Sequence, residues 1–282
     1  MSGTRRVKVD ALPDSAFRYL EYDAIVCIDV IVASTTVVTA VSQGRRTFPA
    51  RSVEEAKALA DLLTDPILAG DVAGKQPAGF EISSGPAELA GRSDVGRPLV
   101  LVSAPGTQLI INSGGGPSVY VTCFRNISAT ADLVASRHQR VAVLGAGYGG
   151  EFRCEDQMAA AWFTHRLMDR GFESDDINTS DLVKRWAEAD ISLAGWGKSA
   201  EYLRRLGQAE ELDFVLGRVD DLGLVCRYED GEVRALGATR PVEESAADVV
   251  GAERVPMAAW SNVVAFEAGR RPVSAAKAPA TT

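Results

Sequence analysis

AIVCIDVIVASTTVVTAVSQG, residues 24–44, joins an apolar, β-branched run to a second apolar segment with helical spacing. The run over residues 24–31 is interrupted only by Asp29 and predicts a strand that is buried on both faces. Ser34 is a suitable N-cap for the helix that follows, and Gly44 is typical of the position just past a helix end. The sequence therefore predicts a strand that carries Asp29 near its C-terminal end and leads directly into a helix.

The start of this helix offers hydrogen-bond donors to an anion. Ser34, Thr35 and Thr36 are consecutive hydroxyl residues at a point where backbone N–H groups are free. Those N–H groups and the positive end of the helix dipole attract anions, phosphate above all. A carboxylate such as Asp29 beside them favours a hard cation such as Mg²⁺. An ordinary strand–turn–helix with a serine cap explains the same residues without a ligand, so both interpretations stay open here.

The composition limits the class of protein and its partners. A chain of 282 residues can form one large domain or two smaller ones. Hydrophobic residues make up 46% and charged residues 24%, which is typical of a globular protein. The net charge of −8 argues against nucleic acid and against an anionic membrane surface as partners. No apolar run approaches the roughly 20 residues that span a bilayer.

The cysteines and the N-terminal residues predict a cytoplasmic location. Cys27, Cys123, Cys154 and Cys226 are widely spaced and form no C-x-x-C pair, which favours buried free thiols in a reducing compartment. Residues 1–15 contain two arginines with no apolar core after them, so we expect no signal peptide.

Beyond residue 44, a pattern of strand, polar junction and helix recurs several times. It predicts an α/β protein with a largely parallel sheet, whose ligands bind outside the carboxyl ends of the strands. Polar residues occupy four such junctions, which a single site at this edge would explain. The four are Asp29 with Ser34, Thr35 and Thr36; Gly106-Thr107; Arg125-Asn126; and residues 145–156. Strands are expected over residues 6–9, 24–31, 45–50, 67–69, 98–103, 119–124, 140–144, 214–216 and 222–227, with a hairpin over 225–235.

Two glycine motifs suggest nucleotide binding only weakly. Gly145, Gly147 and Gly150 satisfy G-x-G-x-x-G between a predicted strand and a predicted helix, as a dinucleotide site requires. Acidic residues crowd the helix start that a pyrophosphate would occupy, so a dinucleotide enzyme is the least favoured hypothesis. Residues 197–199, Gly-Lys-Ser, end like a P-loop, but the first glycine of that motif is missing and no convincing strand precedes them.

Histidine chemistry is poorly supported by the two histidines. His165 has helical spacing with apolar neighbours and is expected in the core or at its boundary, and His138 lies in a polar stretch and is expected to be exposed. Carboxylates near polar loops are far more numerous, which favours Mg²⁺-assisted chemistry.

A series of short blocks then identifies a family. The blocks are Asp29-Val30, Ala33-Ser34-Thr35-Thr36, Ser52-Val53-Glu54-Glu55-Ala56, Gly79-Phe80-Glu81, Pro86, Gly106-Thr107, Arg125-Asn126, Ala146-Gly147, Glu155-Asp156, Asp213-Phe214 and Asp220. In this order they resemble the 2-phosphosulfolactate phosphatase family, over roughly residues 20–230. The resemblance implies an α/β fold of two similar, intertwined three-layer halves. It also implies Mg²⁺-dependent hydrolysis of the phosphate ester of 2-phospho-3-sulfolactate.

The sequence departs from the family pattern at several of these positions. Val32 stands where the family usually has Arg. Asp71 stands where the family has Glu, and Glu81 stands where it has Asp. Ser84-Gly85 replaces an Asn-Ser pair, and Ala104-Pro105 replaces a Thr-Asn pair. The loss of an arginine removes a bidentate partner for a phosphate or a sulfonate.

The resemblance implies a role for each matched residue. The metal ligands would be Asp29 with Asp71, Glu81 or Asp156. Substrate would contact Ser34, Thr35, Thr36, Gly106, Thr107, Arg125 and Asn126. The catalytic residues would be Asp29, Glu155 and Asp156, with Glu155 or Asp156 activating water or acting as the nucleophile.

Two other functions stay open: a relative that acts on a different phosphorylated metabolite, and a non-catalytic anion-binding protein of the same fold. Residues 1–240 are expected to form the catalytic region, residues 241–269 a C-terminal extension and residues 270–282 a disordered tail. A homodimer is only the default expectation.

Overall fold

The computed structural model describes residues 4–236, which all belong to one compact unit. The expected C-terminal extension and tail lie outside the described residues. Within them, no helix is both long enough and apolar enough to cross a membrane.

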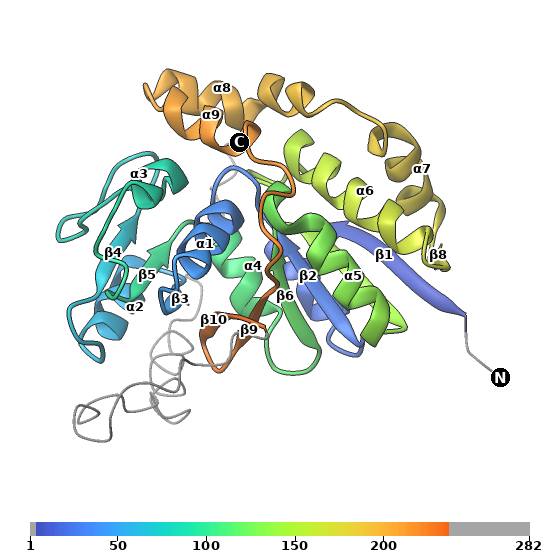
Figure 1. Ribbon diagram of the computed structural model, residues 1–282, viewed down its shortest axis with the longest axis horizontal. Coiled ribbons are helices and arrows are strands. Elements are labelled where there is room, and N and C mark those ends of the chain that lie inside the picture. Colours follow the sequence, from blue (N-terminus) through green and yellow to red (C-terminus); the bar gives the residue numbers. More distant parts are fainter. Residues whose placement is uncertain (1–3, 237–282) are drawn as a thin grey trace, which may run out of the picture. The chain divides into compact units, whose positions relative to one another are not determined.

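One ten-stranded sheet organises the described chain, in the order β4-β5-β3-β10-β9-β6-β2-β7-β1-β8 (Figure 1). The fold class is therefore α/β, as the alternating pattern predicted. The strands are β1 (Arg5–Ala11), β2 (Ala24–Ile28), β3 (Thr47–Pro49), β4 (Ile67–Gly70), β5 (Leu99–Val102), β6 (Ser118–Thr122), β7 (Arg140–Gly145), β8 (Phe172–Ser174), β9 (Cys226–Glu229) and β10 (Glu232–Ala235).

The sheet consists of two parallel blocks joined by an antiparallel hairpin. β4, β5 and β3 form the first block, and β6, β2, β7, β1 and β8 form the second. The β9–β10 hairpin lies between the blocks: β10 pairs antiparallel with β3, and β9 pairs antiparallel with β6. The strands of one block therefore run in the opposite direction to those of the other. The chain enters the second block, crosses to the first and returns, so the blocks are intertwined. Because strands twist steadily along a sheet, strand ends from both blocks can still line one pocket.

Helices cover both faces of the sheet, which gives three layers. Along β2, Ala24, Val26 and Ile28 belong to one apolar cluster, and Ile25 and Cys27 belong to another. This alternation fits a strand that is buried on both faces. The helices are α1 (Ala33–Ser42), α2 (Val53–Ala60), α3 (Pro86–Ala90), α4 (Gly106–Asn112), α5 (Ile127–Arg137), α6 (Cys154–Met168), α7 (Ile177–Trp186), α8 (Lys198–Arg205) and α9 (Ala209–Leu216), with short 3₁₀ turns η1 (Pro13–Arg18), η2 (Phe124–Asn126) and η3 (Ile191–Trp196).

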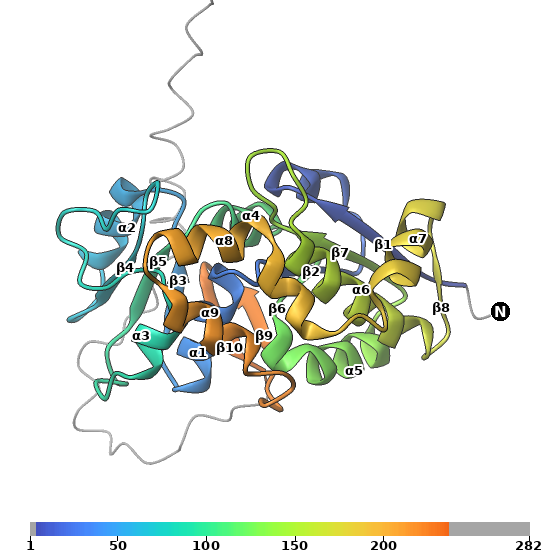
Figure 2. The same cartoon turned by 90° about the horizontal axis from the view of Figure 1, so that it is seen from above.

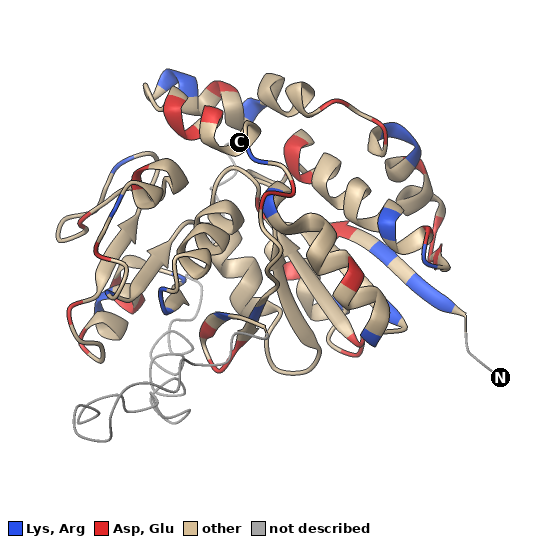
Figure 3. Ribbon diagram, viewed as in Figure 1, with Lys and Arg blue, Asp and Glu red and all other residues tan. Residues whose placement is uncertain are grey.

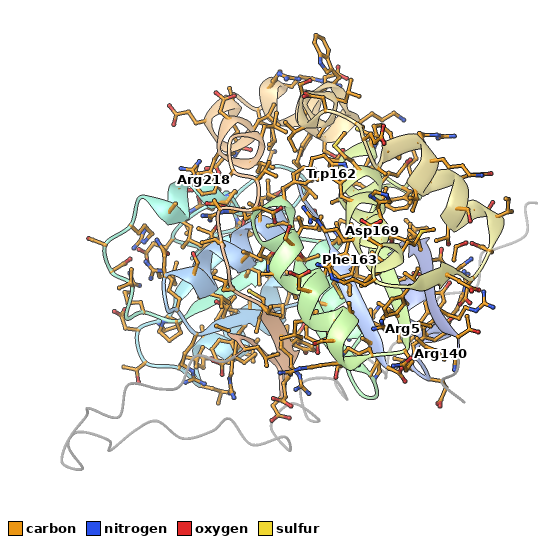
Figure 4. The ribbon with its side chains drawn as sticks, turned by 45° about the vertical axis from the view of Figure 1, so that its right-hand side comes forward. Arg5, Arg140, Trp162, Phe163, Asp169 and Arg218 are labelled. Carbon is orange, nitrogen blue, oxygen red and sulfur yellow. The ribbon has the colours of Figure 1, made fainter. Side chains whose placement is uncertain are left out.

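Helix α6 is anchored on one face of the sheet by its aromatic residues. Phe163 is fully buried, and the Trp162 ring lies 5.2 Å from that of Phe124 (Figure 4). Trp162 also donates from Nε1 to the carbonyl of Trp186 at 2.9 Å, which ties α6 to the end of α7. The first turn of α6 is thereby held against the carboxyl ends of the strands.

Helix α1 begins differently from the prediction. Val32 occupies the N-cap position, so Ser34 as the N-cap is wrong. The Ser34 hydroxyl instead accepts from the backbone N–H of Asp29 at 3.0 Å and donates to the Asp29 carbonyl at 2.7 Å. Gly44 is confirmed just past the helix, with φ +81°.

Two other local predictions are corrected. The strand expected over residues 214–216 is wrong, since these residues end α9. Leu212 and Val215 are three residues apart on that helix and both are buried. This helical spacing cannot be seen within a stretch of only three residues. His138 is half-buried, because its ring packs edge-on to Tyr120 and Nε2 lies 2.9 Å from the Tyr120 hydroxyl.

Helices α8 and α9 lie across the end of the sheet above α1 (Figures 1 and 2). They are held there by a small apolar cluster of Val32, Ala200, Leu203 and Leu212. This places α8 directly opposite the strand ends that carry the polar junctions.

Candidate functional site

A pocket of about 850 Å³ lies at the carboxyl ends of strands from both blocks. Its lining includes Asp29 after β2, Asp71 after β4, Ser103 after β5 and Gly147 after β7. Arg153, Glu155 and Asp156 at the start of α6 and residues from α8 complete it. This is the edge at which α/β sheets bind ligands.

Asp29 lines this pocket and is almost fully buried. Its carboxylate accepts hydrogen bonds from the backbone N–H groups of Ala33 and Gly106, at the starts of α1 and α4. The reciprocal bonds of Ser34 fix its backbone. The N-terminal end of α1 therefore stabilises the protein's own carboxylate, which fixes its orientation.

Gly106 is required by the close approach of α4 to Asp29. A Cβ at this position would stand 2.2 Å from Asp29 Oδ2 and 2.5 Å from the Cβ of Ala33. No side chain fits into that space. Gly106 thus belongs to the site through its backbone, as the predicted Gly106-Thr107 junction requires.

Asp156 and Glu155 enter the pocket from the first turn of α6. Asp156 accepts from the backbone N–H of Val30 at 2.9 Å and from that of Gly147 at 3.2 Å. Glu155 is buried, and its Oε2 lies 3.3 Å from Cys154 Sγ. Asp156 therefore links the β2–α1 loop to the β7–α6 loop, on either side of the same carboxylate cluster.

Burial and neighbouring carboxylates raise the pKa of two of these residues, Asp29 and Asp156. Burial, followed by the nearby charge of Glu155, raises the pKa of Asp29 to about 7. Burial and the charges of Asp29 and Glu155 raise the pKa of Asp156 well above its usual range. Within residues 4–236, no lysine or arginine forms an ion pair with Asp29, Glu155 or Asp156. Three carboxyl groups thus lie together with no cationic partner among the described residues. Figure 3 shows acidic residues at the start of α6.

Asp71 and Ser84 form the opposite wall. Asp71 accepts from the Ser84 hydroxyl and from the backbone N–H of Gly74. Thr36 donates to the Ser84 carbonyl at 2.6 Å. Thr36 therefore connects the first turn of α1 to this wall through the backbone, and its own side chain does not line the pocket.

Four basic residues line the pocket, Arg51, Arg153, Lys198 and Arg205, and none of them was among the predicted site residues. Arg153 stands two residues before Glu155, and its Nε is buried without a hydrogen-bond partner in the described part of the chain. Lys198 comes from the Gly-Lys-Ser segment that fails as a P-loop, yet it lines the pocket at the start of α8. Glu151 pairs with Arg153 and with Lys198. The proximity of Arg153 to Glu155 in sequence is the one signal that could have found it.

Several predicted site residues lie outside the pocket lining. The Thr35 hydroxyl donates to the Val30 carbonyl, and that of Thr107 accepts from the Ser103 N–H. Arg125 forms a bidentate pair with Asp221 at 3.0 and 2.7 Å and donates to Thr39. Asn126 is fully buried and binds backbone and hydroxyl groups around β6. These side chains support the loops that carry the pocket residues.

Glu81 also lies outside the pocket lining. Its carboxylate is paired with Arg92 and Arg97, which lower its pKa. The structure therefore places this proposed metal ligand in a separate ion-pair network.

Asp29 and Asp156 could together hold a magnesium ion. No group of three or more His, Cys, Asp or Glu side chains in residues 4–236 has the arrangement of a metal centre. Mg²⁺, however, is commonly bound by only one or two carboxylates, with waters and substrate phosphate completing the shell. Asp29 and Asp156 meet that requirement, because both are buried, repel each other and pair with no lysine or arginine among residues 4–236.

Comparison with known proteins identifies the family. The sequence model of the 2-phosphosulpholactate phosphatase family matches residues 11–231. A probable 2-phosphosulfolactate phosphatase of Deinococcus radiodurans is 30% identical over 216 residues, covering 74% of this chain and 88% of the relative. Proteins of the same name from Clostridium acetobutylicum and Synechococcus sp. are 26% and 28% identical, over 74% and 77% of this chain and 90% and 93% of their own lengths. The match contains both the β2–α1 loop and the start of α6.

Proposed function

Because the chain belongs to the 2-phosphosulfolactate phosphatase family, we propose that it hydrolyses phosphoric monoesters and that 2-phosphosulfolactate is the first substrate to test. The observation that carries the proposal is the cluster of Asp29, Glu155 and Asp156 in the pocket. These buried carboxylates have no cationic partner in the described chain, although burying a charge without a partner is costly. A site with this cost is typical of one that binds a cation for its function.

We propose that Asp29 and Asp156 hold Mg²⁺. Hydrogen bonds from Ala33, Gly106, Val30 and Gly147 fix both carboxylates in advance. When bound, the ion would withdraw charge from a phosphate oxygen and orient the ester.

The chain's own residues would carry the rest of the reaction. The guanidinium of Arg153, which lines the pocket and pairs with Glu151, would donate to a phosphate oxygen, and such a charge-assisted bond also orients the group. Glu155 would accept a proton from the attacking water while the water oxygen bonds to phosphorus. The bond between phosphorus and the ester oxygen breaks, and the ester oxygen takes up a proton from solvent to leave as an alcohol, while Glu155 returns its proton to solvent. The products are this alcohol and inorganic phosphate.

Phosphate release measures this function directly. The full chain would be incubated with 2-phosphosulfolactate and with a panel of other phosphorylated 2-hydroxy acids and sugar phosphates, with Mg²⁺ and with EDTA. We expect release that requires Mg²⁺. Stabilisation of the folded protein by these esters without any release would instead support the non-catalytic anion-binding alternative.

A further inference from the structure

Gly197 lies directly against Glu155, although it belongs to the Gly-Lys-Ser segment that fails as a P-loop. It is the N-cap of α8, with φ −75° and ψ 167°. This is extended backbone that any residue adopts, so the conformation does not require a glycine. The space does require it, because a Cβ here would stand 2.3 Å from Cys154 Sγ and 3.0 Å from Glu155 Oε2. The start of α8 therefore packs on both Cys154 and Glu155.

The thiol of Cys154 is the group that this packing holds beside Glu155. It donates a hydrogen bond to Glu155 Oε2, with 3.3 Å between the sulfur and the oxygen. The direction of this bond follows from the chemistry of the two groups, because an ionised carboxylate only accepts. An ordinary cysteine has a pKa of about 8.5, so a thiol beside a carboxylate keeps its proton at neutral pH.

These two contacts restrain a carboxylate that has few other polar partners. Glu155 is 1% exposed, and no lysine or arginine of residues 4–236 forms an ion pair with it. Its side chain has several rotatable bonds, so one orientation is kept only where contacts restrain it. Glu155 lines the pocket, whereas Cys154 and Gly197 do not. Both therefore contact the carboxylate from outside the pocket lining.

We propose that Cys154 and Gly197 are positioning residues for Glu155. The thiol donates to Oε2, and the absence of a side chain at Gly197 lets the start of α8 hold the thiol in that position. Oε1 is then the oxygen that accepts a proton from the attacking water. The inference rests on the proposed function, in which Glu155 is the base, and assigns a role to two residues outside the pocket lining.

Infrared spectroscopy of the S–H stretch tests the contact without any turnover. In each background, subtracting the spectrum of the Cys154→Ala variant isolates the band of Cys154 from those of the three buried cysteines. A hydrogen bond donated by a thiol lowers its stretching frequency, and an amide oxygen accepts less strongly than a carboxylate. The band should therefore move to higher frequency in Glu155→Gln and stay in place in Glu151→Gln. An unchanged band in Glu155→Gln would overturn the proposal.

Kinetics of Cys154 variants separate the hydrogen bond from simple packing. With 2-phosphosulfolactate and Mg²⁺, Cys154→Ala should lower kcat of the full chain by about 3- to 10-fold, the range for one hydrogen bond, and leave KM within about twofold. Cys154→Ser should restore most of this loss, because a hydroxyl also donates. If Cys154→Ser is as slow as Cys154→Ala, the thiol only fills space and the proposal is overturned.

Variants of Gly197 test whether the glycine acts through the thiol. Gly197→Ala should lower kcat by at least about tenfold, because the added methyl group displaces the thiol and the carboxylate. Gly223→Ala is the control and should leave kcat unchanged, since a Cβ there meets no atom within 4 Å. Combined with Cys154→Ala, the methyl group has room, so the double variant should lie within about twofold of Cys154→Ala alone. Losses that multiply would show that the two residues act independently and would overturn the proposal.

The failure of this inference is distinct from the failure of the proposed function. A shifted S–H band without phosphate release from any ester would retain the contact between Cys154 and Glu155 and reject the phosphatase. Mg²⁺-dependent release at equal rates by wild type, Cys154→Ala and Gly197→Ala would retain the phosphatase and reject the positioning role.

Discussion

Gly106 and Asp29 lie so close that a single methyl group on Gly106 would stand 2.2 Å from the carboxylate oxygen Oδ2. The two residues come from the starts of α4 and the β2–α1 loop, 77 positions apart in the chain. The backbone N–H of Gly106 also donates to that carboxylate. The contact therefore fixes both the position and the charge environment of Asp29.

Replacing Gly106 should consequently disable the site more than it destabilises the fold. We expect Gly106→Ala to lower kcat/KM by at least about 100-fold, because displacing a group that positions a reaction has effects of this size. The free energy of unfolding should fall by about 1–3 kcal/mol, the usual cost of overpacking. Gly96→Ala is the control, since a Cβ there meets no atom within 4 Å. Similar kinetics for the two variants would contradict the role of the close approach.

Arg125 should behave as a structural residue. It forms a bidentate pair with Asp221, and its side chain is 9% exposed. Arg125→Met should lower the free energy of unfolding by about 2–3 kcal/mol, because it leaves a partly buried carboxylate unpaired. Turnover by the folded fraction should stay within about twofold of wild type.

Arg166→Met is the matched control for Arg125, since Arg166 forms a more exposed pair with Asp220. It should cost no more than about 1 kcal/mol. A large rise in KM for Arg125→Met at unchanged stability would restore Arg125 as the substrate ligand that the sequence suggests.

Arg153 should contribute to substrate binding. Arg153→Met removes the cation whose Nε lacks a partner in the described chain, and kcat/KM should fall by about 10- to 100-fold, as for a lost hydrogen bond to a charged group. Arg218→Met, outside the pocket, is the control. Steady-state kinetics of both variants decide the point, and equal values would exclude Arg153 from the site.

Sequence reasoning found the parts of the site that are local along the chain. The strand before Asp29 and the acidic pair at the start of α6 follow from apolar runs that end in polar junctions. The partner of Arg125 could not be predicted, because Asp221 lies 96 residues away and arrives through the connection to β9. Because this partner could not be predicted, the sequence suggested that Arg125 contacts the substrate, whereas in the structure it stabilises the fold.

The sequence pattern also could not predict the role of the Ser34, Thr35 and Thr36 hydroxyls or the place of the β9–β10 hairpin in the sheet. Ser34, Thr35 and Thr36 match an anion-binding helix start, yet in the structure their hydroxyls bind backbone carbonyls. Whether the hydroxyls bind an anion or the protein's own backbone depends on where those carbonyls lie, which the sequence does not show. The β9–β10 hairpin was predicted over residues 225–235, but its place between two parallel blocks depends on pairing with β3 and β6.

Stability of the metal-free protein should depend on pH through the buried carboxylates. The pKa of Asp29 rises from its usual 3.8 to about 7, so folding favours its protonated form. The stabilisation is fully present below about pH 4 and is lost as pH rises through 7. We expect Asp29 to contribute a loss on the order of 2–4 kcal/mol across this window, measured by denaturant unfolding in EDTA.

Magnesium should oppose this loss, because it stabilises the ionised carboxylates. The increase in Tm on adding Mg²⁺ should therefore be larger at pH 8 than at pH 6. In Asp29→Asn, both the pH slope and this difference should diminish. The same pH dependence in wild type and Asp29→Asn would exclude Asp29 as its origin.

The most direct test compares phosphate release by wild type and Asp29→Asn in Mg²⁺ and in EDTA, together with calorimetric Mg²⁺ affinity. Asp61→Asn, an exposed residue outside the pocket, is the control. We predict Mg²⁺-dependent release by wild type and by Asp61→Asn. Asp29→Asn should be slower by at least about 100-fold, as for loss of a main electrostatic group, and should bind Mg²⁺ more weakly. Full turnover and unchanged Mg²⁺ affinity in Asp29→Asn would contradict the proposed site.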